Sequence, residues 1–150
     1  MEGNARAALL ESVIEHLAEH GLGGATLRSI ASAIGTSHRM LIYHFGSRDG
    51  LLLAIVRRVE EQQRAAMAEL AADPGGSTAD LARRMWERVA DPRVQPHARL
   101  FFELYGRALQ GDPGAAPMLE WVVPTWVDEL TALLVDRGLP ADEARATARL

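Results

Sequence analysis

The stretch that most constrains this chain is residues 26–52, where apolar residues recur at the spacing of two short helices. Thr26 is a residue that favours the position just before a helix, where its hydroxyl can accept a backbone N–H. The apolar residues that follow it lie on one helix face, and they predict a short helix over about 27–33. They are Leu27, Ile30, Ala31 and Ile34. Gly35 then ends this helix.

A second short helix is predicted directly after Ser37, which is another residue that favours a helix start. Leu41 and Phe45 share one face of this helix and would pack inward. The remaining large side chains point elsewhere, and they are His38, Arg39, Met40 and Tyr43. Two short helices joined by a tight turn form a helix-turn-helix, in which the second helix enters the DNA major groove.

This region resembles the TetR family of transcriptional regulators, most strongly over residues 5–53. The positions that carry the resemblance are Ile30, Ala31, Gly35, Ser37, Leu41, Tyr43, His44, Phe45, Ser47, Arg48, Leu51 and Leu52. Two positions depart from the family's usual pattern. Ile42 stands where an aromatic residue is common, and Arg48 stands where lysine is usual, so the second departure keeps the charge.

The resemblance implies DNA contacts for nine residues. The residues expected to face base edges are Ser37, His38, Arg39 and Met40, and those expected to face phosphates are Thr26, Arg28, Tyr43, His44 and Arg48. The chemistry agrees, because an arginine such as Arg39 can bind guanine O6 and N7 together, and a helix N-terminus with a nearby arginine suits a phosphate. The alternative is that three of the aromatic side chains only close a small core: Tyr43, His44 and Phe45. We accept this alternative for Phe45.

The rest of the chain also reads as helical, so the predicted class is all-α. An N-terminal three-helix DNA-binding module (1–46) would be followed by a helical effector-binding and dimerisation bundle (47–150). Further helices are predicted over about 4–19, 48–72, 78–90, from Pro96 onward, over 117–136 with a kink at Pro124, and from Pro140 to the end. The turn at 73–76 should end the long helix. TetR-like chains usually continue for two further helices, so we expect this one to be truncated or unusually short.

The helix after Pro96 is apolar around most of its circumference, which predicts a central position in the bundle. A pocket between bundle helices is a usual place for a small apolar ligand. The expected effector-binding residues are Met67, Trp86, Phe101, Phe102, Tyr105, Leu109, Met118, Trp121 and Trp126. The alternative for each is that it fills a packed core. Because so few charged residues lie in this region, we expect an apolar or aromatic effector.

The charge distribution fits a modest DNA-binding surface. The net charge is −4, and the first 52 residues carry four arginines and five acidic residues, so few phosphates would be neutralised and non-specific affinity should be weak. Residues 26–48, however, contain three arginines and no acid. The chain has no cysteine, no apolar run long enough for a membrane helix and no signal-peptide pattern, so we expect a cytoplasmic protein.

Enzymatic function is not expected. His16 and His20 with Glu19 match an H-x-x-E-H pattern of zinc peptidases, but a helix C-terminus also favours histidine and no third ligand follows. No nucleophile with a paired base, phosphate loop or dinucleotide fingerprint is present, and no cofactor or metal is predicted.

Together these patterns favour a ligand-responsive transcriptional regulator, most simply a repressor. It would bind a near-palindromic DNA operator as a homodimer and be released by a small apolar or aromatic effector. The long helix over 48–72 is expected to be the lever, since it alone would join the two sites. The alternative is a small-molecule binding or interaction module whose helix-turn-helix no longer binds DNA.

Overall fold

The computed structural model describes residues 2–72 and 77–149, and it confirms the all-α prediction. Its helices are α1 (Glu2–His20), α2 (Leu27–Ala33), α3 (His38–Phe45), α4 (Arg48–Ala71), α5 (Thr78–Ala90), α6 (Gln95–Leu109), a π-helical turn (Met118–Val122), α7 (Val123–Asp136) and α8 (Ala141–Ala148). The predicted stop at residues 73–76 lies outside the described residues. None of the helices in the described ranges is both long and apolar enough to cross a bilayer.

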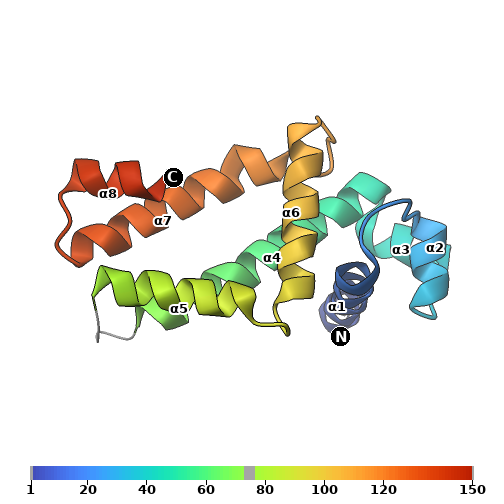
Figure 1. Ribbon diagram of the computed structural model, residues 1–150. Helices are drawn as coiled ribbons and strands as arrows, with labels where there is room; N and C mark the ends of the chain where they lie inside the picture. Colours follow the sequence, from blue (N-terminus) through green and yellow to red (C-terminus); the bar gives the residue numbers. More distant parts are fainter. Residues whose placement is uncertain (1, 73–76, 150) are drawn as a thin grey trace.

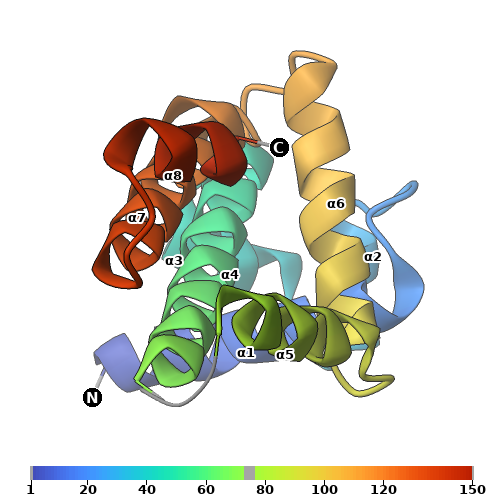
Figure 2. The same cartoon turned by 60° about the vertical axis from the view of Figure 1, so that its left-hand side comes forward.

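The helices form two groups that α4 connects. Figure 1 shows α1, α2 and α3 at one end of the molecule and α5, α7 and α8 at the other, with α4 running between them. Helix α8 folds back along α7, and α6 stands across the middle. Figure 2 shows the same arrangement from the side of the second group, with α5 in front of α1, and with α4 and α6 standing to its left and right.

The predicted helix starts are confirmed, because four hydroxyl side chains close helix N-termini. The hydroxyl oxygens of Thr26 and Ser37 accept the backbone N–H groups of Ser29 and Met40, each at 3.1 Å. Ser47 accepts from the Gly50 amide at 3.0 Å at the start of α4. At α5 the cap is reciprocal, since Ser77 and Asp80 each accept a hydrogen bond from the other's backbone. Such a cap stabilises a helix by about 1 kcal/mol.

One continuous apolar core holds the three-helix module to the rest of the molecule. Val13 and Leu41 are fully buried within the module. The same cluster continues through Ile55 of α4 and Leu100 and Leu104 of α6, which are also fully buried. The module is therefore packed against α4 and α6 together, and each buried leucine or isoleucine contributes about 1.5–3 kcal/mol through burial.

Pro124 divides the predicted helix over 117–136 into two segments. The backbone forms a π-helical turn over Met118–Val122 and becomes α-helical at Val123. Proline has no N–H for the carbonyl four residues earlier, and its ring collides with that carbonyl in an α-helix. The wider π-helical turn before Pro124 relieves this conflict, which confirms the predicted break.

Helix α6 is less central than its sequence predicted. Leu100, Leu104 and Ala108 are buried, but Phe102 and Leu109 on another face are each 62% exposed. The number of apolar residues around the helix therefore did not indicate how much of α6 is buried, because the core covers only one side of it.

Candidate nucleic-acid interface

Helix α3 separates a buried face from an exposed one. Leu41 and Phe45 lie in the core and fix the helix on the module. Met40 and Tyr43 are 41% and 67% exposed, and His38 and Arg39 are exposed beside them. The first turn of α3 contains no acidic residue, so the N-terminal end that would meet DNA carries only neutral and basic side chains. This arrangement suits contacts to base edges in a groove.

The flanking residues predicted to face phosphates are placed on the same helix-turn-helix. Thr26 is exposed and precedes α2, and Ser37, which was predicted to face a base edge, is exposed and precedes α3; both hydroxyl oxygens act as helix caps. Arg28 is exposed on α2. His44 is half-buried, with its ring 5.0 Å from the Tyr43 ring in an edge-to-face contact. The structure thus keeps eight of the nine predicted residues on α2, α3 or the turns before them.

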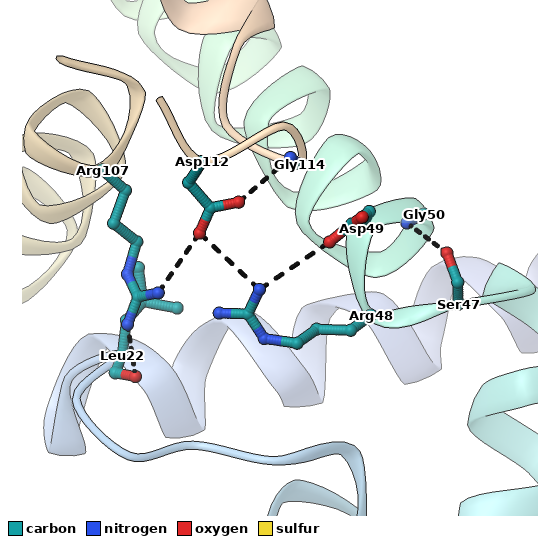
Figure 3. Close-up of polar contacts among 8 residues, drawn as sticks. All are labelled: Leu22, Ser47, Arg48, Asp49, Gly50, Arg107, Asp112 and Gly114. Atoms are coloured by element: carbon teal, nitrogen blue, oxygen red, sulfur yellow. Dashed lines mark hydrogen bonds and ion pairs between the residues drawn. The ribbon is translucent and has the colours of Figure 1, made fainter. Parts of the chain in front are cut away.

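Arg48, which was predicted to face a phosphate, lies in the first turn of α4 and is partly exposed. Its guanidinium points toward the loop after α6, where Nη1 lies 3.6 Å from Asp112 and 3.7 Å from Asp49 (Figure 3). Nη1 of Arg107 lies 3.4 Å from the same Asp112 oxygen, Oδ2. The Gly114 amide donates to the second oxygen of Asp112 at 3.1 Å. Arg48 is therefore part of a junction between α4 and this loop. The sequence could not predict this junction, because Arg48 and Asp112 are far apart in the chain.

Arg6 supports α3, a role that was not predicted from the sequence. Its Nε donates to the carbonyl oxygen of His44 at 3.2 Å, and its guanidinium lies 5.0 Å from the centre of the Phe45 ring. The carbonyls in the last turn of a helix lack partners within that helix, so Arg6 supplies one. The two residues are 38 positions apart, and no local pattern connects them.

The histidines at the end of α1 do not form a metal site in the described part of the chain. The His16 and His20 rings stack with centres 4.5 Å apart, and Nδ1 of His20 lies 2.9 Å from the His16 carbonyl oxygen. No group of three or more possible metal ligands occurs among the described residues. The pair is therefore a local feature of the helix end.

The nine residues predicted to bind an effector do not meet in one described cavity. Met118 is fully buried, while Trp86, Phe102 and Leu109 are exposed. The Phe101 and Trp126 rings stack at 5.0 Å against the core. The other members, Met67, Tyr105 and Trp121, are half-buried.

An apolar groove of about 400 Å³ instead lies between α5, α7 and α8. Its lining is Leu81, Ala82, Met85, Trp86, Leu130, Leu134 and Thr147, so only Trp86 belongs to the predicted set. The apolar residues that α5 contributes to this groove are the sequence signal that could have indicated it. The sequence could not show that α7 and α8 complete it.

The prediction that the helix over 48–72 alone joins the two groups is wrong. Helix α6 also reaches the module directly, because Arg107 donates to the Leu22 carbonyl oxygen at 2.9 Å and Glu103 accepts from the Leu22 amide at 2.6 Å. Two polar side chains of α6 thus contact the turn after α1, a long-range pairing that the helical pattern of α6 could not indicate.

Comparison with known proteins supports the assignment of the module. The family model described as "Bacterial regulatory proteins, tetR family" matches residues 9–55. The chain is 38% identical over 92 residues to the HTH-type transcriptional repressor AcnR of Corynebacterium glutamicum, covering 57% of this chain and 47% of that protein. It is 32% identical over 78 residues to the HTH-type transcriptional regulator BetI of Stenotrophomonas maltophilia, covering 52% and 40%. The chain spans about half the length of the curated relatives it matches, and these relatives carry regulators' names, not those of enzymes.

Solved structures show that the fold is shared beyond the module. A transcriptional regulator from Rhodococcus sp. Rha1 aligns with a TM-score of 0.80 at 24% identity, covering 96% of this chain and 75% of that one. The multidrug binding protein EbrR, solved with imidazole, aligns with a TM-score of 0.68 at 24% identity, covering 96% and 78%. The chain therefore carries the N-terminal module of the TetR family of bacterial regulatory proteins, as the resemblance of its helix-turn-helix predicted.

Proposed function

We propose that this protein is a ligand-responsive transcriptional repressor that binds double-stranded DNA. The observation that carries the proposal is the exposed, acid-free start of α3, which the buried side chains of Leu41 and Phe45 hold firmly on the module. A helix fixed in this way can enter a major groove without first having to be ordered. The match of residues 9–55 to the TetR family supports the same function.

In this proposal the exposed side chains of α3 read the bases. Arg39 is suited to a guanine, because its guanidinium can donate to O6 and N7 together. His38 and Met40 add polar and apolar contacts, and Ser37 lies at the helix start. The phosphate contacts come from Thr26, Arg28, Tyr43 and His44. We assign Arg48 to the junction with Asp112 instead, since its guanidinium is directed there.

We propose that two copies bind a near-palindromic operator. Two-fold symmetry would place the two α3 helices in successive major grooves, about 34 Å apart. A change in this spacing would lower operator affinity, because both helices could no longer enter their grooves together.

The effector in this proposal is a small apolar or aromatic compound that binds the groove between α5, α7 and α8. Its volume of about 400 Å³ falls within the range of known small-molecule sites, and its lining side chains are almost entirely apolar. Trp86, which is 71% exposed, would become covered. A compound that binds better when these helices are rearranged would shift the molecule toward an arrangement with lower DNA affinity. That EbrR is described as a multidrug binding protein supports this choice of ligand class.

Selection of binding sites from random duplex DNA tests the DNA-binding function. A palindromic motif, bound with an affinity that falls steeply as salt concentration rises, is the expected result. If a folded, dimeric preparation enriches no motif, the repressor proposal fails and the chain is an interaction module whose helix-turn-helix no longer binds DNA.

A fluorescent probe tests the effector site separately. N-phenyl-1-naphthylamine is uncharged and aromatic, and its emission rises in an apolar site. We expect it to bind the wild type, and to bind Met85→Arg at least about tenfold more weakly, because the substitution places a charge in the groove. Leu119→Arg is the matched control, since Leu119 is exposed and lies outside the groove. Equal probe binding by all three proteins would contradict the proposed site.

A further inference from the structure

A polar cavity of about 220 Å³ lies between α4, the end of α5 and the start of α6, and we call it the α5–α6 cavity. Figure 2 shows the turn that leads from α5 into the lower end of α6. The lining contains basic, amide and apolar side chains but no acidic one: Gln62, Gln63, Arg88, Arg93, Val94 and His97. Two larger polar cavities elsewhere in the molecule are lined partly by acidic residues. The lining of the α5–α6 cavity therefore favours an anionic ligand.

The turn between α5 and α6 holds Arg93 and Val94 in place. The backbone carbonyl oxygen of Asp91 accepts the N–H groups of Val94 and Gln95, at 2.9 and 3.1 Å. The Asp91 carboxylate accepts the backbone N–H of Arg93 at 2.9 Å and its Nη2 at 2.7 Å. Pro92 further restricts the backbone of this turn. This side of the cavity is therefore ordered before any ligand binds, which lowers the entropic cost of binding.

Asp91 does not cancel the positive charge at the cavity. Its carboxylate is paired with Arg93, so Arg88 leaves one unbalanced positive charge among these three groups. Within the described part of the chain, the side chains of Arg88 and His97 make no hydrogen bond or salt bridge to protein groups. Arg88 is exposed and His97 is half-buried, so their N–H groups are accessible to a ligand in the cavity.

The start of α6 adds to the positive field at the same place. Val94 precedes this helix and His97 lies in its first turn, and both line the cavity. The first turn contains no acidic residue, and no side chain caps it. The first N–H groups of a helix have no partner within the helix and carry its positive dipole end. This field alone would not define a site, but it acts in the same direction as the arginine charges.

We propose that the α5–α6 cavity binds the phosphate group of a small molecule. The guanidinium of Arg88 matches the geometry of phosphate oxygens and binds them through charge-assisted hydrogen bonds. Donors from α4, α5 and α6 surround the cavity on different sides, which suits a tetrahedral phosphate better than a planar carboxylate. The volume lies below the roughly 300–1,000 Å³ of sites for drug-sized ligands, so it fits a small group.

This site is separate from both sites of the proposed function. The α5–α6 cavity shares no lining residue with the apolar groove between α5, α7 and α8. None of its lining residues belongs to α2 or α3. A phosphate bound here is therefore neither the apolar effector nor a phosphate of the operator contacted by the helix-turn-helix.

An NMR titration of the full chain with inorganic phosphate tests the site. Sodium chloride keeps the ionic strength constant, so general screening does not contribute to the observed shifts. The backbone amide signals of Arg88, Arg93 and His97 should move and reach saturation together. Shifts that grow linearly with phosphate concentration, with no saturation, would show non-specific ion binding and overturn the proposal.

Two variants and a matched control test which side chains bind the phosphate. Arg88→Gln removes the unbalanced charge and should weaken phosphate binding at least about tenfold. Gln63→Glu keeps the arginines but places a carboxylate in the lining, and it should weaken binding to a similar extent. Arg83→Gln should leave the affinity unchanged, because Arg83 pairs with Asp80 and lies outside the cavity.

Circular dichroism checks that each variant is folded. Unchanged phosphate affinity in a folded Arg88→Gln variant would overturn the proposal. If that variant does not fold, Gln63→Glu decides, and wild-type affinity in that variant would overturn the proposal.

Two further probes identify the source of the phosphate group. Phenyl phosphate binding at least as tightly as inorganic phosphate would support a phosphorylated organic molecule as the ligand, whereas binding of inorganic phosphate alone would support the free ion. Acetate binding as tightly as phosphate would overturn the assignment to phosphate. These titrations contain no DNA, so their failure leaves the repressor proposal intact, and failure of the DNA selection leaves the phosphate site intact.

Discussion

The guanidinium of Arg48 lies 3.6 Å from the carboxylate of Asp112, which joins the first residue of α4 to the loop after α6. The carboxylate of Asp112 is also shared with Arg107, whose side chain donates to the carbonyl oxygen of Leu22, just after α1. One acidic side chain thus connects three parts of the molecule. Its position also directs the guanidinium of Arg48, a residue predicted to face a phosphate, toward the bundle.

This placement predicts different salt dependences for two arginine variants. Arg28 is exposed on α2 without an ion pair in the described contacts, so Arg28→Ala should reduce the slope of log affinity against log salt by about one. Arg48→Ala should leave that slope unchanged. Titration of operator binding with salt measures both slopes. A reduced slope for Arg48→Ala would restore its predicted role as a phosphate contact.

Replacing two helical glycines by alanine should change the free energy of unfolding in opposite directions. A Cβ at Gly50 would lie 2.1 Å from the Phe45 carbonyl oxygen, so Gly50→Ala must displace the start of α4 and should cost about 1–3 kcal/mol in the free energy of unfolding. A Cβ at Gly106 in α6 would meet nothing within 4 Å, so Gly106→Ala should stabilise the protein by about 0.5–1 kcal/mol. Urea denaturation compares the two, and equal effects would contradict the described packing.

Asp91 should titrate at unusually low pH. The Arg93 side chain and then its backbone N–H donate to the carboxylate and lower its pKa from 3.8 to about 2. Because the pKa is lower in the folded state, this group stabilises the fold above about pH 4, and the contribution is lost as pH falls toward 2. Arg93→Ala should raise the pKa toward its usual value, whereas Arg83→Ala should not change it. Carboxyl ¹³C chemical shifts measure this pKa, and an unchanged value in Arg93→Ala would contradict the assigned cause.

Local features of the fold could be predicted from sequence because their causes are local. Thr26, Ser37 and Ser47 cap helices through hydrogen bonds that span three residues, and Pro124 breaks a helix through its own ring. The exposed face of α3 followed from Leu41 and Phe45, since burying these two residues turns their neighbours outward.

The junctions between helices could not be predicted, because their partners are distant in the sequence. Glu103 is a polar residue in a mostly apolar helix, but its contact with Leu22 spans 81 residues. Phe102 was assigned to a pocket because it is aromatic, and it is exposed. Helical periodicity identifies a face, but it does not identify the helix that covers it.

The central claim is that α3 reads DNA bases through Arg39. Parallel selections from random duplex DNA with the wild type, Arg39→Ala and Arg28→Ala test it most directly. The wild type should enrich a palindromic motif, Arg28→Ala should enrich the same motif with weaker overall binding, and Arg39→Ala should lose its preference at a guanine, worth about 1–3 kcal/mol. If Arg39→Ala enriches the wild-type motif with every base preference intact, Arg39 does not read bases and the account is wrong.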